Sequence, residues 1–105
     1  MIYVIVTVEL VEGKRSDYLK EFKKVSSHVC AEKGCLQYGP AVDVATGIPA
    51  QEPINDNIVT IIEGWTDVNA LKVHMTTPHM QAYRKAVKDY VKQISIKVLE
   101  PVWWS

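Results

Sequence analysis

The sequence predicts a single α+β domain with the element order β-α-β-β-α-β, in which a four-stranded antiparallel sheet carries its helices on one face, as in ferredoxin-like folds. Three observations support this prediction. Four segments have the composition of strands, and the segments between them carry apolar residues at helical spacing. A chain of 105 residues also provides one hydrophobic core and not two. We therefore treat residues 1–105 as one domain.

The first strand is expected over residues 1–10, MIYVIVTVEL. Its even positions are all apolar, whereas its odd positions include Tyr3, Thr7 and Glu9, so its two faces should differ. A helix is expected over residues 15–33. Its apolar stripe comprises Tyr18, Leu19, Phe22, Val25, Val29 and Cys30. We expect it to end at Gly34, because glycine is common just after a helix.

The middle of the chain predicts two strands joined by a long loop. Residues 35–44, CLQYGPAVDV, contain Gly39 and Pro40, which suit an edge strand or a bulge. Residues 46–57 contain two prolines and are too long for a tight hairpin. The third strand, IVTIIEGW, then follows. Its alternation places Glu63 and Trp65 on the same face as the core residue Ile61.

The last part of the chain predicts two helices and a closing strand. A short helix covers residues 66–74, with Thr66 or Asp67 as its N-cap, and a longer one covers residues 76–93. Thr77 is placed to cap the longer helix, with Pro78 at its first helical position. The fourth strand is expected at residues 94–102, ISIKVLEPV.

One face of the longer helix combines apolar and polar character. It carries His79, Tyr83, Ala86 and Tyr90, flanked by Met80 and Val87, and we expect it to be buried. Buried polar groups need partners, so these side chains either bond to one another or line a ligand cavity. His79 lies in the first helical turn, where the helix dipole disfavours imidazolium and keeps a neutral base.

Each candidate site residue also has a structural interpretation. His79 could be a core or helix-start histidine, and His74 a polar residue that ends the short helix. Trp65 could simply pack in the core. Glu63 could orient a histidine by accepting its N–H, or could be only a paired or solvated carboxylate. The sequence alone leaves these alternatives open.

Composition and motifs argue against several classes of function. Lys plus Arg equals Asp plus Glu, 12 against 12, so we expect no nucleic-acid partner and no membrane partner. The apolar start lacks a basic region and contains Glu9, so we interpret it as a strand of a cytoplasmic protein and not as a signal peptide. No apolar run approaches the ~20 residues of a membrane-spanning helix.

The sequence also lacks the motifs that are typical of metal and cofactor sites. Cys30 and Cys35 lack a second pair at zinc-finger spacing, and we expect two reduced thiols. The spacing E-x10-H-x4-H that ends at His79 matches no recurrent metal site, and no glycine-rich phosphate loop occurs. We expect neither a metal nor a cofactor.

The segment at residues 63–83, EGWTDVNALKVHMTTPHMQAY, resembles the antibiotic biosynthesis monooxygenase superfamily, and within it the small quinol-monooxygenase-like proteins. The residues that carry the resemblance are Glu63, Trp65, Leu71, His74, Pro78, His79 and Tyr83. The likeness extends more loosely to VIVTVELVEGKRSDYLKEF and to the GCLQY turn. The loop at 46–57 and the Trp103–Trp104 tail depart from the family pattern.

The resemblance implies a homodimer in which the sheets of two ferredoxin-like domains face each other as a dimeric α+β barrel. The apolar residues expected on the helix-free face agree with this: Tyr3, Ile5, Ile58, Ile62 and Leu99. The resemblance also implies oxidation of a quinol, naphthol or related phenol by O2 without flavin or metal. A deprotonated hydroquinone can itself donate an electron to O2, so the protein needs only a dry site and a base.

On this hypothesis, His79 is the leading candidate base, His74 is the second, and Glu63 orients a histidine. The aromatic substrate would be held by Trp65, Tyr83, Tyr90 and Met80. The alternative from another class is a non-catalytic small-ligand-binding or regulatory barrel, since one fold can host both functions.

Overall fold

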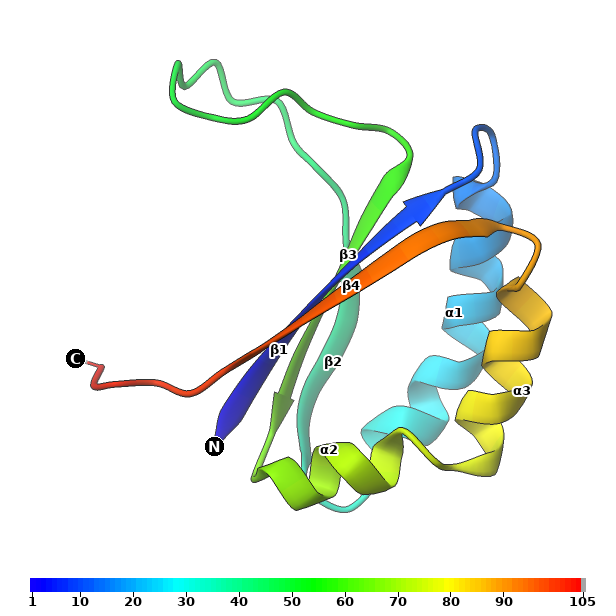
Figure 1. Cartoon of the computed structure of the whole chain (residues 1–105), viewed down its shortest axis with the longest axis vertical. Coiled ribbons are helices and arrows are strands. Elements are labelled where there is room, and N and C mark those ends of the chain that lie inside the picture. The colour runs from blue at the N-terminus through cyan, green and yellow to red at the C-terminus, as the bar shows by residue number, and fades with distance from the viewer. Residues whose placement is uncertain (105) are drawn as a thin grey trace.

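The computed structural model describes residues 1–104. Its elements in chain order are β1 (Ile2–Leu10), α1 (Arg15–Cys30), β2 (Cys35–Ala41), β3 (Ile58–Trp65), α2 (Val68–His74), α3 (Pro78–Val87) and β4 (Val91–Leu99). The strands form one antiparallel sheet in the order β2-β3-β1-β4. The helices lie on one side of this sheet (Figure 1). The predicted ferredoxin-like fold is confirmed.

The core lies between this sheet and the helices, and strand alternation builds its floor. On β1 the buried residues are Ile2, Val4, Val6, Val8 and Leu10, and on β3 they are Val59, Ile61, Glu63 and Trp65. The helices contribute Tyr18, Phe22, Val25, Val29, Leu71, His74, Met80 and Val87. A slip of one residue in strand pairing would turn either set to the other face, so burial fixes the register.

Two helices end earlier than the sequence predicts. α1 ends at Cys30 with Ala31 as its C-cap, so the expected end at Gly34 is wrong. α3 ends at Val87, whereas the prediction extended it to residue 93. The chain from Val91 onward pairs with β1, and this ladder prevails over helical propensity. The fourth strand therefore begins at Val91 and not at residue 94.

The buried face of α3 also differs from the prediction. Met80 and Val87 are buried, His79 and Tyr83 are half-buried, and Ala86 is exposed. The stripe that faces the core therefore follows Met80, Tyr83 and Val87, at positions i, i+3 and i+7. Tyr90 lies beyond the helix, in the turn that leads to β4.

The starts of α2 and α3 agree with the predicted caps. The Asp67 side chain accepts a hydrogen bond from the Ala70 backbone N–H at 2.8 Å. The Thr77 hydroxyl accepts one from the Met80 N–H at 3.3 Å, with Pro78 at the first helical position. These caps fix two short helices around a sharp break in the chain.

The helix-free face of the sheet carries a group of apolar side chains beside polar ones such as Thr7, Thr60 and Lys97. Tyr3, Ile5 and Ile58 are half-buried, while Ile62 and Leu99 are 38% and 43% exposed. The loop between β2 and β3 and the C-terminal tail both extend on this side of the sheet (Figure 1). Within residues 1–104, no helix is both long enough and apolar enough to cross a membrane.

Gly34 is held where no side chain fits. Its φ is +86°, and a Cβ there would lie 2.7 Å from both Ala70 Cβ and Thr66 Oγ1. We expect Gly34→Ala to lower the free energy of unfolding by roughly 2 kcal/mol or more, because backbone strain and overpacking add. Urea denaturation measures this. Gly47→Ala is the matched control, since Gly47 has φ +76° but open space around it. Equal losses in the two variants would contradict the role of the close contact.

Candidate functional site

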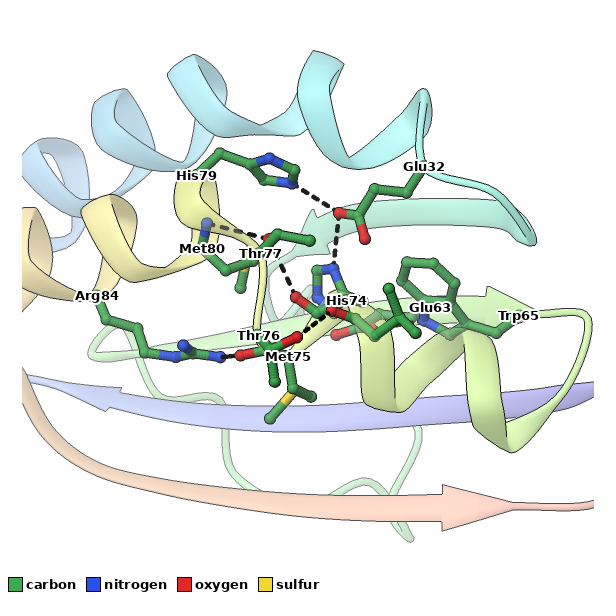
Figure 2. Close-up of polar contacts among 11 residues, drawn as sticks. Glu32, Glu63, Trp65, His74, Met75, Thr76, Thr77, His79, Met80 and Arg84 are labelled. Atoms are coloured by element: carbon green, nitrogen blue, oxygen red, sulfur yellow. Dashed lines mark hydrogen bonds and ion pairs between the residues drawn. The ribbon is translucent and has the colours of Figure 1, made fainter.

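The polar centre of the protein is the carboxylate of Glu32, to which two histidines bind (Figure 2). Glu32 Oε2 lies 2.9 Å from Nδ1 of His74 and 2.7 Å from Nε2 of His79. The side chains of His74 and Glu32 are 2% and 10% exposed, and that of His79 is 26% exposed. Hydrogen bonds to a charged group are strong where solvent exposure is low, so the three side chains act as one hydrogen-bonded unit.

Glu32 selects a different nitrogen on each ring. An ionised carboxylate only accepts hydrogen bonds, so His74 donates through Nδ1 and His79 through Nε2. The nitrogens left to accept a proton are Nε2 of His74 and Nδ1 of His79. The carboxylate would also stabilise the imidazolium that forms when either ring takes up a proton.

Local backbone structure brings these residues together. Glu32 lies in the turn after α1, where its N–H donates to the Val29 carbonyl at 2.9 Å and its carbonyl accepts from Cys35 N–H at 3.1 Å. His74 ends α2 and His79 follows the N-terminal proline of α3. The Thr77 hydroxyl donates to the His74 carbonyl at 3.1 Å, which ties the break between the helices to the site.

Aromatic rings enclose His74. The centroid of its ring lies 4.7 Å from that of Trp65 and 5.6 Å from that of Tyr38. Phe22 stacks on Tyr38 at 5.1 Å. Trp65 and His74 are 0% and 1% exposed, so these side chains fill the interior beside the histidine.

The tyrosines of α1 and α3 extend this aromatic layer. The hydroxyls of Tyr18 and Tyr83 are hydrogen-bonded to each other. Burial raises the pKa of Tyr18 to about 12 and raises the pKa values of Tyr38 and Tyr83 as well. These phenols are therefore neutral at physiological pH and serve as hydrogen-bonding groups.

Glu63 has a different partner from the one first proposed for it. Its Oε1 accepts a hydrogen bond from Trp65 Nε1 at 2.9 Å, within the buried core. Burial raises the pKa of Glu63, while the Trp65 hydrogen bond and nearby His74 act in the opposite direction. The carboxylate that contacts the histidines is Glu32, and Glu63 matches its alternative interpretation as a paired carboxylate.

The predicted residues are only partly brought together. His74, His79 and Trp65 lie at the polar centre, and Tyr83 lies in the adjoining aromatic layer. Met80 is 6% exposed and belongs to the core. Tyr90 does not join the site, because it lines a surface depression with Asp17 and Lys20.

Sequence reasoning missed Glu32. It is separated from His74 by 42 positions and from His79 by 47. Nothing in the local pattern distinguishes it from the other acidic residues. A signal in the sequence is Gly34, two residues after Glu32, because this glycine marks the turn that follows the first helix.

A groove between α1 and α3 opens next to this site. Its volume is about 290 Å³, and both His79 and Tyr83 line it together with His28. The ring of His28 lies 5.7 Å from that of His79, measured between centroids. Of the two histidines bound to Glu32, His79 therefore contacts the groove, whereas His74 lies in the closed interior.

Glu63 makes stability depend on pH. Its pKa in the folded protein is raised above the ordinary 4.5, so its contribution to stability is complete below that pH and is lost as the pH rises through the folded-state pKa. Glu63→Gln keeps an acceptor for Trp65 and removes this titration. We expect the free energy of unfolding of the variant minus that of wild type to become more positive as the pH rises from about 4 toward neutrality. Urea denaturation at each pH measures this difference. Glu52→Gln, in the exposed loop, controls for the lost charge; a difference independent of pH would contradict the prediction.

Comparisons with known proteins agree with the resemblance. Residues 1–86 match the family model described as "Antibiotic biosynthesis monooxygenase". The chain is 39% identical over 103 residues to the Escherichia coli (strain K12) protein named "Probable quinol monooxygenase YgiN", across 96% of this chain and 98% of that protein.

Solved structures share the fold at lower identity. PA3566 from Pseudomonas aeruginosa matches with a TM-score of 0.80 and 22% identity, over 97% of this chain and 94% of that one. Rv0793 from Mycobacterium tuberculosis matches with a TM-score of 0.80 and 20% identity, over 99% and 97% of the two chains. These structures show the shared fold, and the family-model match and the 39% identical relative establish that the chain belongs to the antibiotic biosynthesis monooxygenase family.

Proposed function

We propose that this protein is a cofactor-independent monooxygenase that oxidises a quinol, naphthol or related phenol with O2. The single observation that carries the proposal is the histidine pair held by Glu32 in a chain of this family. The 39% identity to a protein named as a quinol monooxygenase supports the substrate class.

The chemistry requires little from the protein. A base removes the hydroxyl proton, and the resulting phenolate donates an electron to O2. One oxygen atom enters the ring and the other leaves as water, so that a phenol with a free para position becomes a quinone. The substrate supplies all the electrons.

We assign the role of base to His79, with His74 as the second candidate. Nδ1 of His79 belongs to a side chain that lines the groove and is 26% exposed, whereas His74 is buried. Glu32 is a positioning residue, because it holds the ring and favours the imidazolium without itself reaching the groove lining. Tyr83 offers an aromatic surface to a bound ring.

A non-catalytic ligand-binding protein is the alternative. The closed packing of Trp65 and His74 favours it, because buried side chains at these positions stabilise the fold without any role in turnover. Oxygen uptake with a panel of hydroquinones separates the two: saturable binding without uptake above the buffer rate would favour the alternative.

We also propose that the protein is a homodimer whose subunits pack through their helix-free sheet faces. An apolar surface that includes Tyr3, Ile5, Ile62 and Leu99 is unfavourable in water and suits a self-complementary interface. The loop between β2 and β3 and the C-terminal tail extend on this side of the sheet, where they would contact a second copy (Figure 1).

Substitutions at the polar centre test the catalytic assignment. We expect His79→Ala to slow oxygen-dependent turnover about 10²- to 10⁴-fold, the usual contribution of a general base. Glu32→Gln should also slow turnover, because the neutral amide cannot stabilise an imidazolium. Oxygen-electrode rates and melting temperatures are measured together, with Glu52→Gln as the control for Glu32→Gln. His79→Ala and His74→Ala variants that keep normal rates, or lose rate only as they lose folded protein, would show that the histidines are structural.

The proposed dimer has its own test. Ile62→Lys places a charge on the helix-free face, where two copies would meet, and should shift the protein to a monomer in sedimentation velocity. Val73→Lys is the matched control, because Val73 is 56% exposed on α2, away from that face. A wild-type monomer at micromolar concentration would contradict the dimer, as would an Ile62→Lys protein that sediments like wild type.

A further inference from the structure

We propose that the groove between α1 and α3 is the ligand site of this protein, that it binds an uncharged planar hydroxy-aromatic compound of one or two rings, and that His28 is a second contact for the ligand's hydroxyl. The inference rests on the proposed function for the role of the ligand as substrate. It goes further in naming where the ligand binds, what charge it carries and which additional side chain holds it.

The size and walls of the groove indicate a flat apolar ligand. Its volume is about 290 Å³, whereas a protein cavity of about 150 Å³ can hold benzene. There is thus room for two fused rings. The apolar walls come from Val25 on α1 and from Ala82 and Ala86 on α3, and the ring of Tyr83 offers a stacking surface.

The polar end of the groove is formed by two imidazoles from different helices. The rings of His28 and His79 lie 5.7 Å apart at an interplanar angle of 27°. His79 uses Nε2 to contact Glu32, so Nδ1 is the nitrogen that can accept a proton from a ligand. His28 has no such assignment in the proposed function. Two neighbouring imidazoles can together hold the oxygen of one hydroxyl or two adjacent hydroxyls.

The charges at the groove indicate that its ligand is uncharged. Lys24 and Glu21 both line it and form an ion pair with each other at 3.0 Å. Because the one lysine and the one glutamate of the lining compensate each other, the groove has no excess of lysine and arginine charge that would favour a carboxylate or phosphate. Hydroxyl groups and ring faces are therefore the features that the site can recognise.

Among residues 1–104, packed side chains fill the interior next to His74. Trp65 and His74 are 0% and 1% exposed, and Trp65 is also bonded to Glu63. Tyr83 separates the two regions, because it lines the groove while its hydroxyl bonds to Tyr18 inside the core. A ligand can thus reach His79 from the groove without disrupting the aromatic layer.

A variant that fills the groove tests the site directly. Ala82 is exposed on α3, so Ala82→Trp should fold while its indole occupies the groove. Lys85→Trp adds the same ring to the same helix at a position that does not line the groove, and is the matched control. The probe is 1,4-dihydroxynaphthalene without oxygen, followed by NMR of the histidine ring protons. We expect saturable shifts of the His28 and His79 signals in wild type and in Lys85→Trp, and their loss in Ala82→Trp.

Turnover in air tests the contribution of His28. We expect His28→Ala to raise KM up to about tenfold, the effect of one lost hydrogen bond, with little change in kcat. A fall in kcat with unchanged KM would overturn this contact.

The outcomes separate this inference from the proposed function. Binding and turnover retained in folded Ala82→Trp would overturn the groove as the site while leaving monooxygenation intact. The absence of saturable shifts at both histidines in wild type would overturn it as well. Binding at the groove without oxygen uptake would support the site and contradict the proposed monooxygenase activity.

Discussion

The candidate site depends on one largely buried carboxylate, that of Glu32, whose side chain is 10% exposed. Glu32 connects the turn after α1 to the last residue of α2 and to the first turn of α3, through contacts of 2.9 and 2.7 Å. Without it, His74 would be a polar ring enclosed by aromatic side chains with no charged partner. Removal of the Glu32 carboxylate would leave His74 without its hydrogen-bond acceptor. The loss of folding free energy would then be larger than the net contribution of the hydrogen bond itself.

Most of the fold could be predicted from the sequence, because it follows from local patterns. The third strand matches its predicted bounds, since unbroken alternation and a polar loop define it. The N-caps at Asp67 and Thr77 are equally local signals. The end of α3 could not be predicted in this way: residues 91–93 suit a helix in isolation but pair with β1 in the fold.

The site was less predictable than the fold because its central contact is long-range. The motif at 63–83 identified the histidines and Trp65 but not the acid between them, which lies in a different turn of the chain. It also suggested Glu63 as the orienting carboxylate, since strand alternation places Glu63 on the core-facing side of β3. The turn after α1, with its backbone hydrogen bonds and the packing of Gly34 against α2, brings Glu32 to His74.

The structure separates the two histidines into different surroundings. His74 faces a closed aromatic interior, whereas His79 lines a groove that a ligand can enter. One carboxylate holds both rings, so a positive charge formed on His79 in the proposed proton transfer would also affect Glu32 and His74. The two predicted bases, His74 and His79, therefore lie together at Glu32. Two of the predicted substrate-binding residues, Trp65 and Met80, are instead buried in the core.

The tautomers of the two rings test this account most directly. Long-range nitrogen–proton NMR correlations, recorded at a pH where the rings are neutral, identify which nitrogen of each histidine carries the proton. The account predicts Nδ1–H for His74 and Nε2–H for His79, because Glu32 accepts from those atoms. The finding of Nε2–H on His74, or of the same pattern in wild type and Glu32→Gln, would contradict the central role of Glu32.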